Sequence, residues 1–122
     1  NNFIVKNNLK NKTNDKNFQN VRIFSIKDFL DTNNIKKVSL IKMDIEGDEF
    51  AIINSIDKDT YLRIGAFIME YHEINDKNEN FRNKKDIENK LRENGFSVQI
   101  FPSNFDRNMG FIFALNKRSD II

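Results

Sequence analysis

The sequence has no cysteine and no tryptophan, and only one proline, one histidine and four glycines among its 122 residues. Without cysteine, the chain can form no disulfide, no zinc–thiolate site and no thiol nucleophile. No apolar run approaches the roughly 18 residues that a membrane-spanning helix needs. The first residues, NNFIVKNNLKNK, lack the apolar core of a signal peptide. We therefore expect a cytoplasmic chain with no membrane partner.

Neither sign of charge is in clear excess. The chain carries 20 basic and 18 acidic residues, for a net charge of +2. Domains that bind nucleic acids usually show a strong basic excess or stripe, so we expect no nucleic-acid partner. The hydrophobic share of 39% and the charged share of 31% are typical of a soluble globular domain. The length allows one domain at most.

Runs of β-branched and aromatic residues alternate with amphipathic stretches along the chain. We predict strands over 21–26, 38–45, 64–72, 96–101 and 110–117, and helices over 26–34, 47–56 and 81–95. Such alternation predicts an α/β fold with mostly parallel strands. The last two predicted strands are joined by a short connection, which indicates an antiparallel terminal strand.

Polar side chains gather where two predicted strands end. Asp44 and Glu46 end one apolar run, and Glu70 and His72 end the next. In open α/β sheets, ligands bind outside the carboxyl ends of the strands. If the two strands are neighbours, these four side chains converge on one edge of the sheet and form a candidate site.

A purely structural interpretation competes with this one. Asp48 and Glu49 stand in the first turn of a predicted helix, where negative charge complements the helix dipole. Gly47 suits the tight turn between strand and helix. Glu70 is able to pair with a nearby basic residue, and a lone histidine such as His72 is more often structural than catalytic.

Known templates for phosphate loops, dinucleotide binding and serine nucleophiles are missing from the sequence. One histidine with scattered carboxylates is not a zinc site, so we predict no resident metal. The alternative is an enzyme that holds a divalent cation through oxygen ligands from Asp44, Glu46 and Glu70.

The stretch LIKMDIEGDEFAII resembles the signature of the FkbM-type methyltransferases, in which a strand with a Lys-x-Asp-x-Glu-Gly-x-Glu pattern leads into a helix. The matching residues are Lys42, Asp44, Glu46, Gly47 and Glu49.

Three further stretches resemble the same family in the expected order. FIMEYH ends in Glu70 and His72, as the family's next strand ends in a glutamate with a histidine close behind. LRENGF fits the end of the following helix. VRIFSIKDFL is similar to the upstream strand and helix start, with Lys27 where the family usually has aspartate.

This resemblance implies a class I S-adenosylmethionine-dependent methyltransferase with a partial Rossmann-like sheet. It covers residues 21–117, which correspond to the C-terminal half of the family's domain. Residues 1–20 are then a loop or short strand at the truncated edge of the missing half, and 118–122 are a tail. The family's glycine-rich cofactor loop is absent from the sequence, so we expect this fragment alone to bind the cofactor weakly.

The resemblance also implies roles for the candidate residues. Asp44 and Glu46 would bind the cofactor beside its reactive methyl group, while Asp44, Glu70 and His72 would be catalytic. The implied reaction is O-methylation of a hydroxyl on a small molecule, sugar or glycan. The alternative is a non-catalytic truncated remnant or interaction module of the same fold. The missing N-terminal half or another chain is the expected partner that covers the sheet edge.

Overall fold

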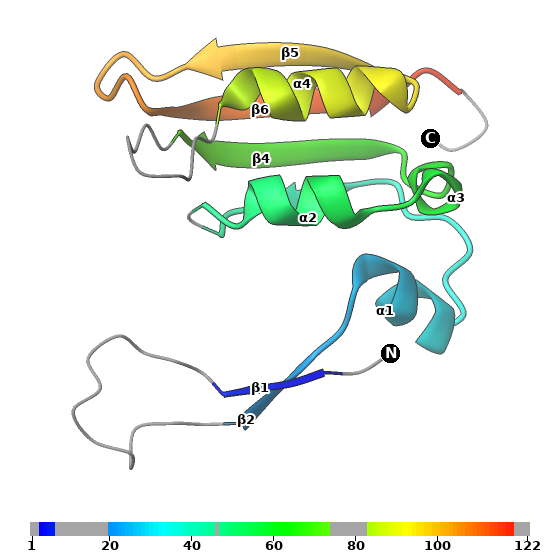
Figure 1. The fold of residues 1–122 in the computed structure, drawn as a ribbon. Coiled ribbons are helices and arrows are strands. Elements are labelled where there is room, and N and C mark those ends of the chain that lie inside the picture. Colours follow the sequence, from blue (N-terminus) through cyan, green and yellow to red (C-terminus); the bar gives the residue numbers. More distant parts are fainter. Residues whose placement is uncertain (1–2, 7–19, 46, 74–82, 119–122) are drawn as a thin grey trace. The chain divides into compact units, whose positions relative to one another are not determined.

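The computed structural model describes residues 3–6, 20–45, 47–73 and 83–118 (Figure 1). Contacts divide the chain into two compact units, Asn1–Lys36 and Lys37–Ile122. In the described part of the chain, no helix is long and apolar enough to cross a membrane.

The first unit contains strands β1 (Phe3–Lys6) and β2 (Asn20–Ile23) and helix α1 (Ile26–Thr32). The two strands form their own antiparallel sheet. The helix begins after Ser25, whose hydroxyl accepts a hydrogen bond from the backbone N–H of Asp28 at 3.0 Å. This side-chain cap satisfies one of the free N–H groups of the first turn.

The strand expected over 21–26 does not join the main sheet. Its register partners lie in β1, with Phe3 opposite Ile23 and Val5 opposite Val21. The prediction of one continuous strand–helix alternation is therefore wrong for this segment. The physical reason is that an extended apolar run pairs equally well with any available strand, and β1 supplies one.

The second unit is built on a four-stranded sheet with the order β3-β4-β6-β5. Its strands are β3 (Ile41–Met43), β4 (Ala66–His72), β5 (Phe96–Pro102) and β6 (Met109–Asn116). Strands β3 and β4 are parallel, whereas β6 pairs antiparallel with both β4 and β5.

The expectation of a mostly parallel sheet needs correction, because two of the three pairings in this sheet are antiparallel. The antiparallel direction of the last strand is confirmed, but its place is not at the end of the sheet. Since β6 lies between β4 and β5, it separates two strands that run in the same direction. The fold is α/β with a mixed sheet. It agrees with a Rossmann-like fold only at the level of this general class.

Three helices accompany this sheet: α2 (Glu49–Ser55), α3 (Lys58–Tyr61) and α4 (Lys84–Glu93). Helices α2 and α4 lie over the same face of the sheet (Figure 1). Both follow the sequence prediction closely, and residues 81 and 82 of the predicted last helix lie outside the described residues. The short helix α3 is an addition, and it starts where the Asp57 side chain accepts a hydrogen bond from the N–H of Thr60 at 2.8 Å.

The core lies between the sheet and its helices. Along β4, Phe67, Met69 and Tyr71 are buried and alternate with partly exposed residues. The rings of Tyr61, Phe67 and Phe96 pack with centroid separations of 5.5 to 6.3 Å. Because side chains alternate along a strand, Glu70 and His72 fall on the face of β4 opposite the core.

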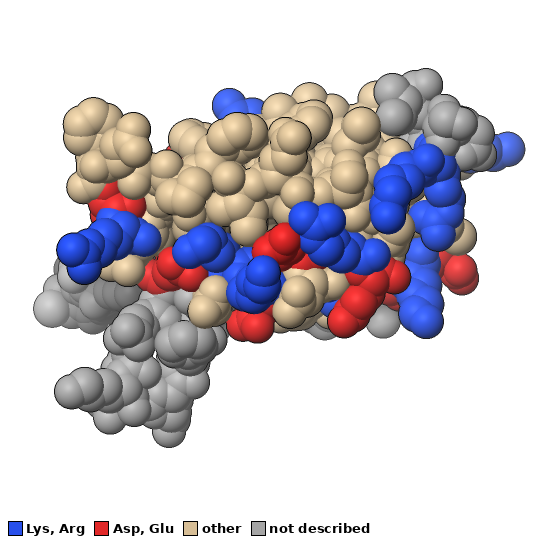
Figure 2. Space-filling model, turned by 90° about the horizontal axis from the view of Figure 1, so that it is seen from above, with Lys and Arg blue, Asp and Glu red and all other residues tan. Residues whose placement is uncertain are grey.

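That opposite face of the sheet keeps large apolar side chains in solvent. Phe101 on β5 and Phe111 on β6 are register neighbours and are 54% and 51% exposed. Helix α4, by contrast, carries charged side chains that pair with one another. Glu88 lies 3.0 Å from Arg92 and 3.2 Å from Lys85. Figure 2 shows a band of charged side chains beside a broad area with none among the described residues. The basic partners in these pairs are exposed, with Lys85 at 67% and Arg92 at 49%.

Candidate functional site

The predicted site lies at the edge of the sheet where two parallel strands end. Strand β3 ends at Met43 and β4 ends at His72. Asp44 directly follows β3, is exposed, and makes no hydrogen bond or ion pair with another described residue. Glu46 lies outside the described residues. Asp44 therefore lies exposed at the edge where the sequence predicts it.

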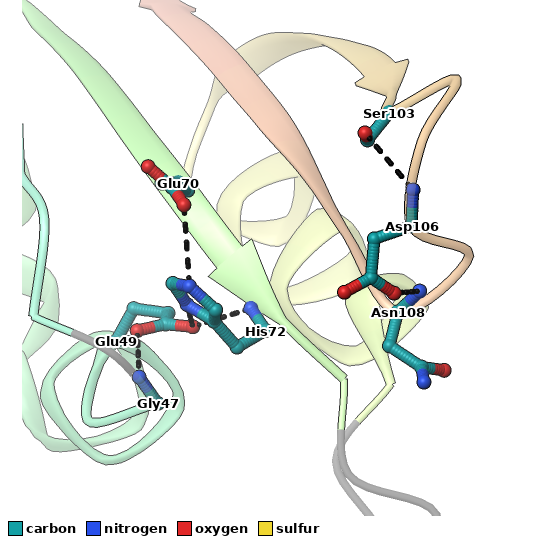
Figure 3. Close-up of polar contacts among 7 residues, drawn as sticks. All are labelled: Gly47, Glu49, Glu70, His72, Ser103, Asp106 and Asn108. Carbon is teal, nitrogen blue, oxygen red and sulfur yellow. Dashed lines mark hydrogen bonds and ion pairs between the residues drawn. The ribbon is translucent and has the colours of Figure 1, made fainter.

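The structure brings Glu70 and His72 together, as predicted. Nε2 of His72 lies 3.2 Å from Oε1 of Glu70 (Figure 3). Two residues apart on one strand, these side chains project from the same face. Their side chains are 21% and 26% exposed, so both remain accessible to a bound molecule.

A second carboxylate reaches the same imidazole from the other side. Oε1 of Glu49 lies 3.5 Å from Nδ1 of His72, and the Glu49 side chain is fully buried. The imidazole of His72 is thus flanked by two carboxylates, from α2 and from its own strand (Figure 3).

Glu49 is the site residue that sequence reasoning undervalued. Its Oε2 accepts a hydrogen bond from the N–H of Gly47, and its Oε1 accepts one from the N–H of His72, both at 2.8 Å. A buried charge requires such partners, because desolvation is otherwise very costly. Complementing the helix dipole is only part of its role. The signal that marks it is its match to the last glutamate of the Lys-x-Asp-x-Glu-Gly-x-Glu pattern.

The short length of β3 explains why His72 needs this carboxylate. Met43, the last residue of β3, is the register partner of Met69. Beyond Met69, strand β4 has no described strand on that side, so the N–H of His72 lacks a ladder partner. The side chain of Glu49 supplies the missing acceptor. A buried N–H without an acceptor would be destabilising.

On its other side, the end of β4 is held by the turn between β5 and β6. The N–H of Glu73 donates to the carbonyl of Asn108 at 2.6 Å. Within this turn, the hydroxyl of Ser103 accepts hydrogen bonds from the N–H groups of Phe105 and Asp106, and the Asp106 carboxylate accepts one from the N–H of Asn108 (Figure 3). Side-chain bonds of this kind stabilise turns, so the turn forms an ordered neighbour of the site.

The start of α4 is tied to the end of β4 by Lys84. Its N–H donates to Glu73 at 2.9 Å, and its ammonium lies 3.3 Å from the same carboxylate. The ammonium also lies 5.7 Å from the centroid of the Tyr71 ring. Burial raises the pKa of the Tyr71 phenol, and the Lys84 charge only partly opposes this. Tyr71 therefore remains neutral near pH 7 and is no base for the site.

Among the described residues, no group of three or more histidine, aspartate or glutamate side chains is arranged to hold a metal ion. Of the three oxygen ligands considered for a divalent cation, Asp44 and Glu70 are described and Glu46 is not. Because one of its three proposed ligands lies outside the described residues, the metal alternative stays a prediction.

The chain is similar to a known protein family over most of its length. The model of the methyltransferase FkbM domain matches residues 2–98. This chain belongs to the FkbM methyltransferase family. The matched region contains Asp44, Glu49, Glu70 and His72, and it starts upstream of residue 21, where the resemblance in the sequence becomes visible.

Neither the curated proteins nor the solved structures contain a significant match to this FkbM domain. Family membership therefore identifies a methyltransferase in general, and the flanked imidazole is the feature that gives its site a chemical interpretation. An imidazole beside a carboxylate is the common arrangement for moving a proton in an enzyme.

Proposed function

We propose that this chain belongs to an S-adenosylmethionine-dependent methyltransferase that methylates a hydroxyl oxygen of a small molecule, sugar or glycan. The observation that carries the proposal is the contact of 3.2 Å between Nε2 of His72 and Glu70 at the end of β4 in an FkbM domain. A hydroxyl acceptor must lose its proton during methylation, and this pair supplies a base with an orienting carboxylate.

In this proposal, His72 and Glu70 act on the acceptor. The O–H bond of the acceptor breaks, its oxygen keeps the electron pair, and the proton moves to Nε2 of His72. The carboxylate of Glu70 then stabilises the positive charge on the imidazole. Both side chains are partly exposed, as contact with an acceptor requires.

S-adenosylmethionine, when bound, would supply an electrophilic methyl group on a positively charged sulfur. The exposed carboxylate of Asp44 at the end of β3 fits that charge, because opposite charges attract. We propose Glu46, two residues later, as its partner in binding the cofactor. The sequence contains no glycine-rich loop for the rest of the cofactor, which is why we expect weak binding by these 122 residues alone.

The test is methyl transfer from labelled S-adenosylmethionine to a panel of hydroxyl compounds, catalysed by the natural polypeptide that carries this sequence. Glu70→Gln and His72→Gln are expected to lower the transfer rate by about 100- to 10,000-fold, the usual contribution of general acid–base catalysis. Glu88→Gln, in α4 and outside the predicted site, is the control and should leave the rate unchanged.

Equal rates in the wild type and in both site variants would contradict the proposed roles. Absence of transfer to every acceptor, together with absence of cofactor binding by the natural polypeptide, would favour the alternative. The domain would then be a non-catalytic remnant or interaction module.

A further inference from the structure

Glu49 holds His72 at two points with one oxygen atom. Oε1 accepts the backbone N–H of His72 at 2.8 Å and lies 3.5 Å from Nδ1 of the same residue. The other oxygen accepts the N–H of Gly47 at 2.8 Å. The carboxylate cannot turn away without leaving a buried backbone N–H unpaired, so the backbone sets its position beside the imidazole.

The second observation concerns Nδ1 itself. This atom is buried and makes no hydrogen bond with the residues that the structure describes. The buried Oε1 of Glu49 faces it at 3.5 Å. If Nδ1 carried a lone pair, two electron-rich atoms would face each other in a site of low dielectric constant. Nε2 faces the Glu70 carboxylate at the shorter distance of 3.2 Å, but the Glu70 side chain is 21% exposed, so solvent screens that contact more than the fully buried one. A proton on Nδ1 makes the same contact attractive, and a small ring rotation converts it into a hydrogen bond.

We propose that Glu49 is a positioning residue that keeps a proton on Nδ1 of His72 and so leaves Nε2 as the nitrogen that gains and loses the catalytic proton. This inference rests on the proposed function, in which Nε2 and Glu70 act on the acceptor hydroxyl. Glu49 does not touch the acceptor, because its side chain is completely buried. A buried carboxylate that fixes the tautomer of a catalytic histidine acts in the same way in serine hydrolases.

The test is the tautomer of the imidazole, measured by NMR of its isotopically labelled nitrogens. His72 is the one histidine of the 122-residue chain, so a chain prepared without a histidine tag gives signals from this residue alone. At a pH where the ring is neutral, the wild type is expected to be mainly the Nδ1–H tautomer. Glu49→Gln keeps the size of the side chain, removes its charge and replaces one acceptor oxygen with an NH2 donor, and it is expected to increase the Nε2–H tautomer.

Asp48→Asn is the matched control. It removes the same charge one residue away, from an exposed side chain that makes no capping hydrogen bond to α2. The tautomer should not change in this variant. If both variants changed the tautomer equally, the helix dipole and not the contact with Nδ1 would be responsible, and the inference would be overturned.

A wild-type chain with mainly the Nε2–H tautomer would also overturn the inference, and this measurement requires no variant to fold. Unchanged nitrogen signals in a folded Glu49→Gln variant would likewise overturn the inference. The experiment uses neither cofactor nor acceptor. Failure of the proposed function would therefore appear separately, as absent methyl transfer in a protein with the expected tautomer.

Discussion

At the scale of single residues, the two tyrosines show how burial fixes a protonation state. Both are at most 1% exposed, and burial raises the pKa of each phenol. Tyr61 donates a hydrogen bond to the carbonyl of Ile53, whereas the hydroxyl of Tyr71 has no partner among the described residues. Neither phenol can ionise inside the core without a large desolvation cost.

This burial predicts a loss of stability in alkali. An unfolded tyrosine loses its proton near pH 10, whereas the folded phenols keep theirs to higher pH. Above that pH, the unfolded state binds fewer protons than the folded state. The free energy of unfolding therefore keeps its neutral-pH value below pH 10 and falls as the pH rises above it. Urea melts at increasing pH, with tyrosinate absorbance followed in parallel, measure this effect.

Tyr71→Phe provides the comparison for the alkaline measurement. It removes one buried phenol and no described hydrogen bond, so it should weaken the pH dependence without lowering stability at neutral pH. Tyrosinate absorbance that appears near pH 10 while the chain stays folded would show that the phenols are accessible and contradict the prediction.

At the scale of elements, the neighbouring strands approach closely at Gly110 of β6. Its register partners are Tyr71 on β4 and Pro102 on β5. A β-carbon at this position would lie 2.5 Å from the Tyr71 hydroxyl, 2.5 Å from the carbonyl oxygen of Phe101 and 2.8 Å from the α-carbon of Pro102. Two of these atoms belong to the backbone, so they cannot move aside cheaply.

Gly110→Ala is therefore expected to destabilise the second unit by about 1–3 kcal/mol, the usual cost of overpacking a well-packed core. Chemical denaturation followed by circular dichroism measures the change. Ala114→Gly in the same strand is a useful comparison, because it should destabilise by creating space instead of a clash. A fully stable Gly110→Ala chain would show that the three strands can separate at this point.

The elements themselves were largely predictable, but their pairing was not. The apolar runs identify β4, β5 and β6, and Ser25 marks the start of α1, because these signals are local. The short β5–β6 connection predicts an antiparallel pair, yet nothing local says that β6 also pairs with β4. Likewise, an apolar run such as 21–26 does not specify which sheet it joins.

The same distinction applies to the candidate site. The contact between Glu70 and His72 follows from strand alternation and was predictable. The contact between Glu49 and His72 joins residues 23 positions apart, and it depends on β3 ending early, which no sequence pattern reveals. Asp44 is at the expected edge, and its proposed role in cofactor binding stays a prediction.

At the scale of the whole molecule, the strand order makes the second unit depend on its last strand. β6 provides the hydrogen-bonding partner of both β4 and β5, and its Ile112 and Ala114 are completely buried. Without β6, the β3–β4 pair and β5 have no connection within the sheet.

A chain that stops after Asn108 is therefore expected to lose cooperative unfolding entirely, since the loss of β6 removes both antiparallel pairings and part of the core. Hydrogen exchange of the β4 amides is the measurement. A chain that stops after Arg118 is the control and should keep its protection. Persistent protection of β4 in the shorter chain would show that β3 and β4 are stable by themselves.

The position of β6 also has a consequence for folding during synthesis of the protein on the ribosome. β4 and β5 leave the ribosome before the strand that must lie between them has been made. During that interval, both present open edges and apolar faces in an unfinished chain, which is the condition in which nascent proteins aggregate or recruit chaperones. The second unit can complete its sheet only after residues close to the end of this sequence have emerged.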